Sequence, residues 1–201
     1  MQFADVVRFH HEGSTGFSRH YLTLYSIVLG LEAQSVYEFG AGRSSQVILT
    51  ALQHTGGRLI SCDQRELSGT GLNTALITEA GGQWQYVQGD SLDHVPILPK
   101  DLAFDLVLHD GSHARDIVTK DLRNILPHMK QDGLILVHDT AHHDKGDNLS
   151  PAVIDAMGGV QHSRVTLPYG YGLTIVRIEQ DFGHGSIELD WQKGDAVKEA
   201  I

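Results

Sequence analysis

Apolar and polar positions alternate in two different rhythms along this chain. Short apolar runs bounded by turn residues are typical of buried strands, whereas apolar residues three and four positions apart are typical of helices that cover a sheet. The first pattern predicts strands at 35–39, 58–62, 84–88, 104–109, 133–138, 160–167 and 172–179. The second predicts helices at 17–33, 44–54, 71–80, 113–126 and 150–157, with Ser44 or Ser45 as the N-cap of the helix at that point.

The order of these elements predicts a Rossmann-like α/β fold. Strands that alternate with helices form a mostly parallel sheet with helices on both faces. The last two strands are joined by the turn 168–171 instead of a helix, so they should be antiparallel neighbours. We therefore expect a seven-stranded, mostly parallel sheet with an antiparallel final strand. We expect one domain over 1–201, with an N-terminal helical cap (1–33) over the cofactor mouth, a core (34–179) and a polar tail (180–201).

Charge and composition narrow the range of partners. The chain has 201 residues, a net charge of −10 and no basic stretch, which disfavours nucleic acid and favours a small-molecule substrate. No apolar run reaches the roughly 18 residues of a membrane span. The single cysteine, Cys62, excludes an intrachain disulfide, and we expect a cytoplasmic protein. A homo-oligomer is compatible with the sequence.

The segment Glu38-Phe39-Gly40-Ala41-Gly42 lies between the first predicted strand and the following helix. Glycines at such a junction let the backbone approach a ligand closely. A Gly-x-Gly pattern alone does not distinguish one nucleotide cofactor from another, and it also occurs in tight turns that bind nothing. Ser45 stands where a dinucleotide-binding loop has its third glycine, which counts against NAD.

Two further acidic residues follow predicted strands. Asp63 ends the second strand, where a carboxylate can accept hydrogen bonds from both ribose hydroxyls. Asp90, in the segment Gly89-Asp90-Ser91 after the third strand, is placed to accept from an adenine amino group. Taken alone, each is also an ordinary turn residue.

These segments, together with Phe104 to Gly111, resemble those of class I S-adenosylmethionine (SAM)-dependent methyltransferases. The resemblance is stronger to a bacterial branch of small-molecule O-methyltransferases with Asp-Gly-x-His and His-Asp-Thr motifs, which is related to catechol-type enzymes and to cephalosporin-hydroxylase-like proteins. It implies that SAM binds to Glu38, Gly40, Ala41, Gly42, Ser44, Ser45, Asp63, Gln64, Gly89, Asp90, Ser91 and Asp110. In this family Glu38 and Gly40 would face the methionine end of the cofactor.

The ends of the fourth and fifth strands carry the candidate chemistry. Asp110 and Asp139 follow these strands, and two such aspartates can converge on one cation. Oxygen ligands suit Mg²⁺, and an added imidazole would favour Mn²⁺, Fe²⁺ or Zn²⁺. The alternatives are that Ser112-His113 only begins a helix and that Asp139-Thr140 only caps a loop. His142 and His143 are more typical of exposed loop residues than of ligands.

The resemblance implies specific roles at these strand ends. The metal ligands would be Asp110, Asp139 and Thr140, where Thr140 replaces the usual Asn. His113 stands in place of the lysine base of catechol-type enzymes, and imidazole is a reasonable base near neutral pH. His113 and Asp110 would thus carry catalysis of methyl transfer to a hydroxyl group, with Mg²⁺ or another divalent cation.

Other functions remain open at the level of sequence. The His-rich strand ends also fit a hydroxylase-like protein of the same fold, and a metal-free methyltransferase is a further alternative. The short chain leaves little room for a substrate lid, which would suit a non-catalytic SAM- or nucleotide-binding module. The sequence does not distinguish sugar, phenol and amino-acid-derived acceptors.

Overall fold

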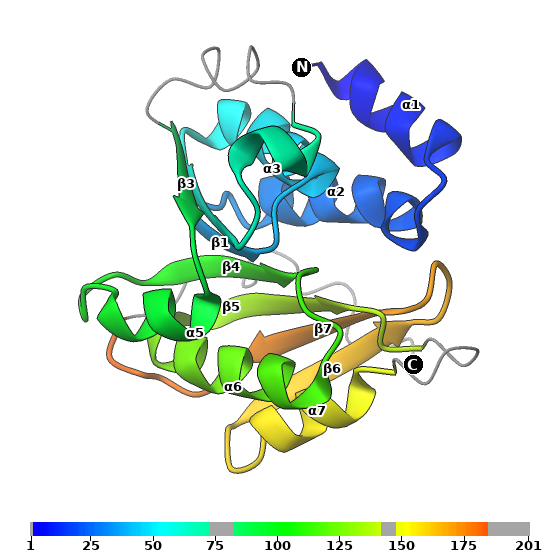
Figure 1. Ribbon diagram of the computed structural model, residues 1–201. Coiled ribbons are helices and arrows are strands. Elements are labelled where there is room, and N and C mark those ends of the chain that lie inside the picture. Colours follow the sequence, from blue (N-terminus) through cyan, green and yellow to red (C-terminus); the bar gives the residue numbers. More distant parts are fainter. Residues whose placement is uncertain (1, 73–82, 142–147, 185–201) are drawn as a thin grey trace, which may run out of the picture.

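A seven-stranded sheet forms the centre of the molecule in the computed structural model, which describes residues 2–72, 83–141 and 148–184 (Figure 1). Its strands are β1 (Ser35–Phe39), β2 (Arg58–Asp63), β3 (Trp84–Gln88), β4 (Phe104–His109), β5 (Met129–His138), β6 (His162–Leu167) and β7 (Leu173–Ile178). They lie in the order β3-β2-β1-β4-β5-β7-β6, and only β7 runs antiparallel to its neighbours. The predicted fold class is therefore confirmed, including the antiparallel final strand.

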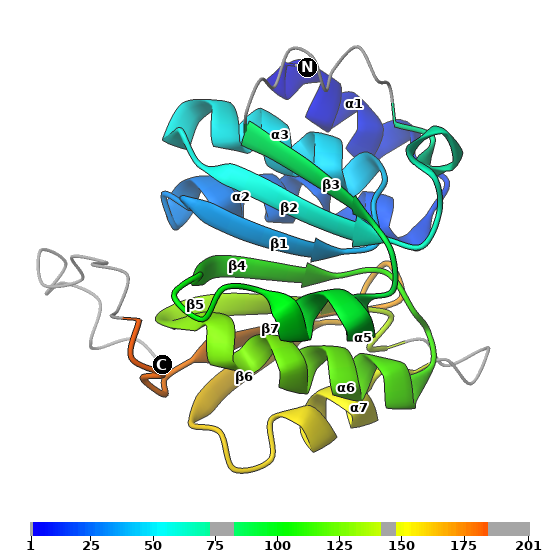
Figure 2. The same cartoon turned by 60° about the vertical axis from the view of Figure 1, so that its left-hand side comes forward.

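Helices cover both faces of this sheet (Figure 2). One face carries α1 (Phe3–Glu12), α2 (Tyr21–Gly30) and α3 (Arg43–Thr55), and the other carries α5 (Ser91–His94), α6 (Arg115–Ile125) and α7 (Ser150–Ala156). Short 3-10 turns occur at Gly16–His20, Leu67–Thr70, Val95–Ile97 and Leu126–His128. Within the described ranges, no helix is long and apolar enough to cross a membrane.

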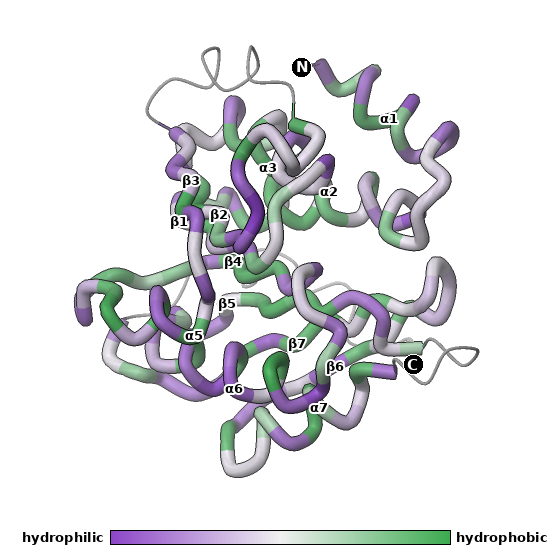
Figure 3. Tube along the Cα trace, viewed as in Figure 1, coloured by the Kyte–Doolittle hydropathy of each residue, from purple (hydrophilic) through white to green (hydrophobic). Residues whose placement is uncertain are grey.

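The two central strands, β1 and β4, are buried along their whole length because helices cover both faces. Successive side chains point to opposite faces of a strand, so Val36 packs into the layer under α2 and α3 while Tyr37 packs into the layer under α6 and α7. In Figure 3, β4 and β5 are largely hydrophobic, whereas α1 and α6 alternate between hydrophilic and hydrophobic positions. The sheet thus fixes the positions of the strand ends, where the candidate site residues lie.

Several boundaries differ from those expected. The helix predicted over 17–33 is a 3-10 turn followed by α2, and β5 begins at Met129 instead of 133. Neither Ser44 nor Ser45 is the N-cap of α3: Gly42 takes that position, and its N–H donates to the Ser45 hydroxyl at 3.0 Å. Most of the helix predicted at 71–80 and most of the polar tail lie outside the described residues.

The N-terminal cap interlocks with the turn between β6 and β7. A Cβ added to Gly16 would lie 2.0 Å from Cδ2 of Tyr171, and one added to Gly170 would lie 2.6 Å from the carbonyl oxygen of Gly16. Gly172 adopts a left-handed φ of 89°, and a Cβ added to it would lie 2.4 Å from the backbone nitrogen of Ala141. These close approaches hold the cap against the carboxyl end of β5.

We expect Gly172→Ala to destabilise the protein more than Gly159→Ala, its matched control. Both glycines have a left-handed φ, but a Cβ on Gly159 would meet nothing within 4 Å in the part of the chain that the structure describes. The conformational penalty of about 1 kcal/mol is therefore common to both variants, and backbone crowding should bring the loss at Gly172 to about 3 kcal/mol. Urea unfolding measures both free energies, and equal losses would contradict the crowding at Ala141.

Candidate active site

The glycine loop after β1 brings three strand ends together. Gly40 has a φ of 83°, and an added Cβ would lie only 2.7 Å from the carbonyl oxygen of Asp110. The Gly40 N–H donates to the carbonyl of Cys62 at 2.8 Å, so the loop also joins β2. A Cβ added to Gly42 would meet no atom of the described residues within 4 Å. The first glycine is thus required by the packing of the chain itself, and the second borders open space that a ligand can enter.

Glu38 supports this loop from behind. Its side chain is 0% exposed and accepts hydrogen bonds from the hydroxyls of Ser44 and Ser45, both at 2.5 Å, and of Ser61 at 2.8 Å. Burial raises the pKa of Glu38 to about 7, although the three hydroxyls oppose the rise. Ser45 is also 0% exposed, whereas Ser44 lines a cavity. The contact of Glu38 and Ser45 with a cofactor stays a prediction.

A cavity of about 510 Å³, which we call cavity I, opens beside the ends of β2 and β3. The predicted cofactor residues that line it are Gly40, Asp63, Gln64, Gly89, Asp90, Ser91 and Asp110. The structure therefore brings together the residues expected to hold a nucleoside, although they come from four strand ends far apart in the sequence.

Asp63 is held by an arginine that the sequence analysis did not single out. Its carboxylate accepts from the backbone N–H of Ala41 at 2.8 Å and pairs with the guanidinium of Arg65 at 2.6 Å. Burial opposes ionisation, but these contacts outweigh it and lower the pKa of Asp63. Arg65 also donates to the Ala41 carbonyl at 2.7 Å, so it ties the acidic residue to the glycine loop.

The remaining wall of cavity I rests on a buried polar network. Asp90 caps α5 by accepting from the backbone N–H of Leu92 at 2.9 Å. Ser91 donates to Asp121 at 2.7 Å, and the other Asp121 oxygen lies 3.1 Å from Nε2 of His109. Asp121 is only 2% exposed. Its place on the buried face of α6 was the available sequence signal, since an aspartate there needs buried partners.

A second cavity, of about 600 Å³, lies under the N-terminal cap and is called cavity II. It shares Gly40, Arg65 and Asp110 with cavity I, so the two spaces adjoin at these residues. The predicted cofactor residues that line it also include Ala41, Gly42 and Ser44. The cap contributes Thr15, Phe17 and Tyr21 to its wall, and Tyr171 comes from the turn after β6.

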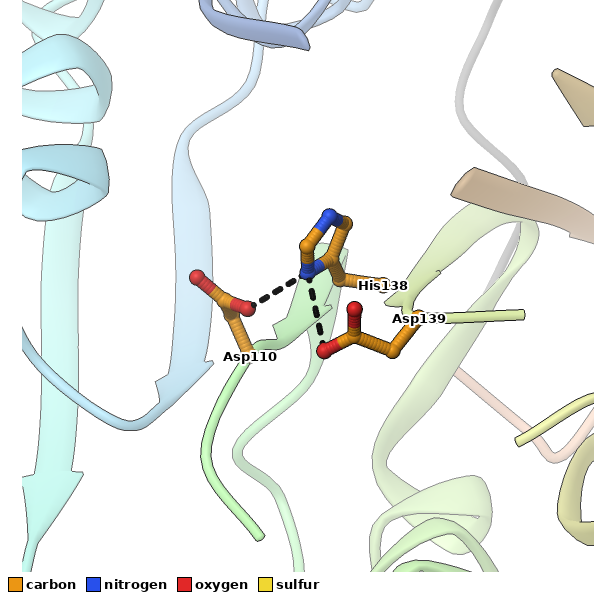
Figure 4. Close-up of side chains that lie close together, drawn as sticks. All are labelled: Asp110, His138 and Asp139. Atoms are coloured by element: carbon orange, nitrogen blue, oxygen red, sulfur yellow. Dashed lines mark ion pairs between the residues drawn. The ribbon is translucent and has the colours of Figure 1, made fainter. Parts of the chain in front are cut away.

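Asp110, His138 and Asp139 converge where cavity II meets the sheet (Figure 4). Nδ1 of His138 lies 3.0 Å from Oδ1 of Asp110 and 3.2 Å from Oδ2 of Asp139. Adjacent strand residues normally point to opposite faces, but Asp139 has a left-handed φ of 57°, which turns its side chain back toward His138. His138 therefore joins the pair of aspartates that the sequence predicted.

This cluster fits a divalent cation by the chemistry of its donors. One atom from each residue lies within 4.8 Å of the others, and carboxylate oxygens with an imidazole nitrogen are common metal ligands. Burial lowers the pKa of His138, but the two neighbouring carboxylates outweigh burial and raise it to about 10. The predicted ligand Thr140 is 3% exposed, and its Oγ1 has no hydrogen-bond partner among the described residues.

His113 lies beside the cluster and lines cavity II. Its Nε2 is 2.8 Å from Oδ2 of Asp139, and its side chain is 56% exposed. The helix predicted to begin at His113 begins at Arg115, so His113 belongs to the loop after β4. His142 and His143 lie outside the described residues.

We expect Glu38 to make the wild-type protein less stable as pH rises from about 4.5 to about 7. In the folded chain, Glu38 keeps its proton up to about pH 7, whereas an ordinary glutamate loses its proton near pH 4.5. This difference between the ordinary and the folded pKa corresponds to about 3 kcal/mol of stability, present below pH 4.5 and lost as pH rises through 7. Glu38→Gln removes this contribution, so urea unfolding at pH 5 and pH 8 should show a smaller decline in the variant. Parallel pH profiles would show that Glu38 titrates normally.

The sequence of this chain matches the model of a known protein family. A family model described as "Methyltransferase domain" matches residues 37–140. By sequence search, no curated protein matches the chain.

Solved structures share the fold at low sequence identity. A methyltransferase from Podospora anserina bound to S-adenosylhomocysteine (SAH) superimposes with a TM-score of 0.68 at 14% identity, over 87% of this chain and 88% of that one. The O-methyltransferase TomG from Streptomyces achromogenes gives 0.63 at 19% identity, over 81% of each chain. An O-methyltransferase from Bacillus cereus gives 0.64 at 13% identity, over 80% of each.

The sequence match includes the glycine loop, Asp63, Asp90 and the cluster at Asp110 and Asp139. Since it spans more than half of the chain, the protein belongs to the methyltransferase-domain family and is a class I SAM-dependent methyltransferase.

Proposed function

We propose that the protein transfers the methyl group of SAM to a hydroxyl group of a small molecule, assisted by a divalent cation. The observation that carries this proposal is the junction of the two cavities at Asp110. Cavity I has the residues expected around a nucleoside, and cavity II has His113 and the cluster of Asp110, His138 and Asp139. A methyl donor and an acceptor bound on either side of Asp110 would meet at this junction.

Similar proteins support oxygen as the acceptor atom. TomG was solved with SAM and takes part in tomaymycin synthesis, and CalS11 is a TDP-rhamnose 3′-O-methyltransferase with a TM-score of 0.63 at 15% identity. Both act on small molecules or in their synthesis. The volume of cavity II, about 600 Å³, also suits a small acceptor.

The cofactor would lie along the glycine loop. In the proposed complex, the Asp63 carboxylate accepts hydrogen bonds from the ribose hydroxyls. To make room for them, Arg65 would give up some of its contacts with that carboxylate. Asp90 and Ser91 border the adenine. Gly42 leaves space for the methionine part, and Asp110 lies where the sulfonium would face cavity II.

The acceptor would be deprotonated beside the aspartate cluster. A cation held by Asp110 and Asp139 would lower the pKa of an acceptor hydroxyl. If the His113 ring donates its Nε2–H to Asp139, Nδ1 keeps its lone pair and takes the hydroxyl proton. The oxygen then forms a bond to the methyl carbon as the bond from carbon to sulfur breaks, and the sulfur leaves as the neutral thioether of SAH. Holding donor and acceptor in line supplies much of the acceleration.

Activity is tested by incubating the protein with SAM, Mg²⁺ or Mn²⁺, and a panel of sugar, phenol and amino-acid-derived acceptors. Mass spectrometry should detect an acceptor that gains one methyl group together with an equal amount of SAH. If SAH binds but no acceptor is methylated, the proposal fails in favour of a non-catalytic binding module. If activity is full without any divalent cation, only the metal part fails.

We expect His113→Ala to lower kcat by about 10²- to 10⁴-fold, the usual contribution of a positioned general base. The affinity for SAH, measured by calorimetry, should stay within a few-fold of the wild type, because His113 lines cavity II and not cavity I. His54→Ala is the control, since His54 is an exposed residue of α3. An unchanged kcat in His113→Ala would assign the proton transfer to another group.

We expect Asp63→Asn to weaken SAH binding by about 10- to 100-fold, because a charged hydrogen-bond acceptor for the ribose contributes about 1.5–3 kcal/mol. Asp116→Asn, on the exposed part of α6, is the matched control and should bind SAH like the wild type. Calorimetry measures both affinities. Equal affinities for Asp63→Asn and the control would contradict the placement of the ribose beside β2.

A further inference from the structure

We infer that His138 is the third protein ligand of the cation site and that the site therefore prefers a transition-metal ion, such as Mn²⁺, Fe²⁺ or Zn²⁺, over Mg²⁺. This inference rests on the cation proposed above and specifies its chemistry. It also differs from the ligand set that the sequence resemblance implies, in which the third ligand is Thr140.

The hydrogen bond at the far side of the ring determines what His138 offers to the aspartates. Nε2 lies 2.8 Å from the carbonyl oxygen of Gly170, which can only accept, so Nε2 carries a proton. Nδ1 lies 3.0 Å and 3.2 Å from oxygens of Asp110 and Asp139. A cation that displaces the Nδ1 proton would therefore meet one imidazole lone pair and two carboxylate oxygens.

The geometry around Nδ1 supports this assignment. His138 is only 4% exposed, and its Nδ1 forms ion pairs with the two carboxylates but has no hydrogen-bond partner among the described residues. Figure 4 shows Nδ1 directed between the two carboxylates. A buried imidazole aimed into an acidic pair is therefore a second observation, independent of the aspartates themselves, that points to a bound cation.

Gly170 is itself fixed in position. It has a left-handed φ of 58°, and it packs so closely on the cap that an added Cβ would lie 2.6 Å from the Gly16 carbonyl oxygen. The Gly170 carbonyl also lies 3.3 Å from Nε2 of His20, a second buried ring. A metal-binding histidine usually donates its other ring N–H to such a fixed acceptor, which orients the ring.

Two aromatic contacts also hold the rings of His138 and its neighbour His20 in place. The Phe17 ring packs edge-on against His138 with 4.9 Å between centroids, and Tyr169 stacks on His20 at the same distance. The orientation of His138 is thus set by the N-terminal cap and by the turn after β6, and not only by its own strand. The N-terminal cap thus lines cavity II and also supports the ring of His138.

The donor set then decides which ion is favoured. Mg²⁺ prefers oxygen ligands and keeps several waters, whereas an imidazole nitrogen stabilises Mn²⁺, Fe²⁺, Co²⁺ and Zn²⁺ more strongly. A site with two carboxylates and one imidazole should therefore discriminate against Mg²⁺.

The test is a titration of chelator-treated full-length protein with Mn²⁺ and with Mg²⁺, each with and without SAH. We expect Mn²⁺ to bind about 100-fold more tightly than Mg²⁺. His138→Asn should reduce this ratio to about tenfold or less. His128→Asn is the matched control, because His128 is also a buried ring bonded to a backbone carbonyl, at the opposite end of β5. Its ratio should equal that of the wild type.

A spectroscopic measurement on the wild type keeps the inference testable if His138→Asn does not fold. Pulsed electron paramagnetic resonance of the Mn²⁺-loaded protein should show coupling to an imidazole nitrogen. Absence of that coupling, equal affinities for Mn²⁺ and Mg²⁺, or no cation binding at all would overturn the inference. The last result would mean that a protonated His138 occupies the space between the carboxylates.

These outcomes are separable from those of the proposed function. Methyl transfer that proceeds equally well with Mg²⁺ in His138→Asn and in the wild type would overturn the role of His138 and leave the transferase intact. Nitrogen-coordinated Mn²⁺ without methyl transfer to any acceptor would leave the metal ligand intact and overturn the transferase proposal.

Discussion

The close contact between Gly40 and the backbone of Asp110 is the constraint on which the rest of the site depends. β1 and β4 are adjacent and parallel, so their carboxyl ends meet at one edge of the sheet. Gly40 allows the two loops to touch there, and the Asp110 N–H donates to the Phe39 carbonyl at 3.1 Å. Asp110 is thereby held between cavity I and cavity II, where it can serve a cofactor on one side and an acceptor on the other.

A strained backbone at Asp139 and a buried polar group at Glu38 lie on either side of this contact. Asp139 adopts a left-handed φ that costs a non-glycine residue about 1–3 kcal/mol, a cost that other contacts must offset. Because of this φ, the Asp139 carboxylate lies beside both His113 and His138. Behind the glycine loop, Glu38 is buried with three serine hydroxyls, which fixes the first turn of α3 against β1 and β2.

The sequence predicted the fold because two periodicities, one for strands and one for helices, persisted through the core. It also predicted that Asp63, Asp90 and Asp110 lie at one edge of the sheet, because residues that follow parallel strands share that edge. Their contacts with a cofactor stay predictions. It did not predict the position of His138 beside the two aspartates, since alternation along a strand places His138 and Asp139 on opposite faces unless the backbone turns. Arg65 and Asp121 were missed for a related reason: their partners lie in other elements, and their packing is visible only once those elements are placed.

In the proposed complex, the nucleoside of the methyl donor lies in cavity I and its sulfur lies at Asp110, facing His113 and Asp139. The most direct test is a crystal structure of the protein with SAH. We expect the ribose beside Asp63, the adenine against Asp90 and Ser91, and the sulfur at the junction of the two cavities. SAH bound with its sulfur directed away from Asp110, or bound outside cavity I, would contradict it.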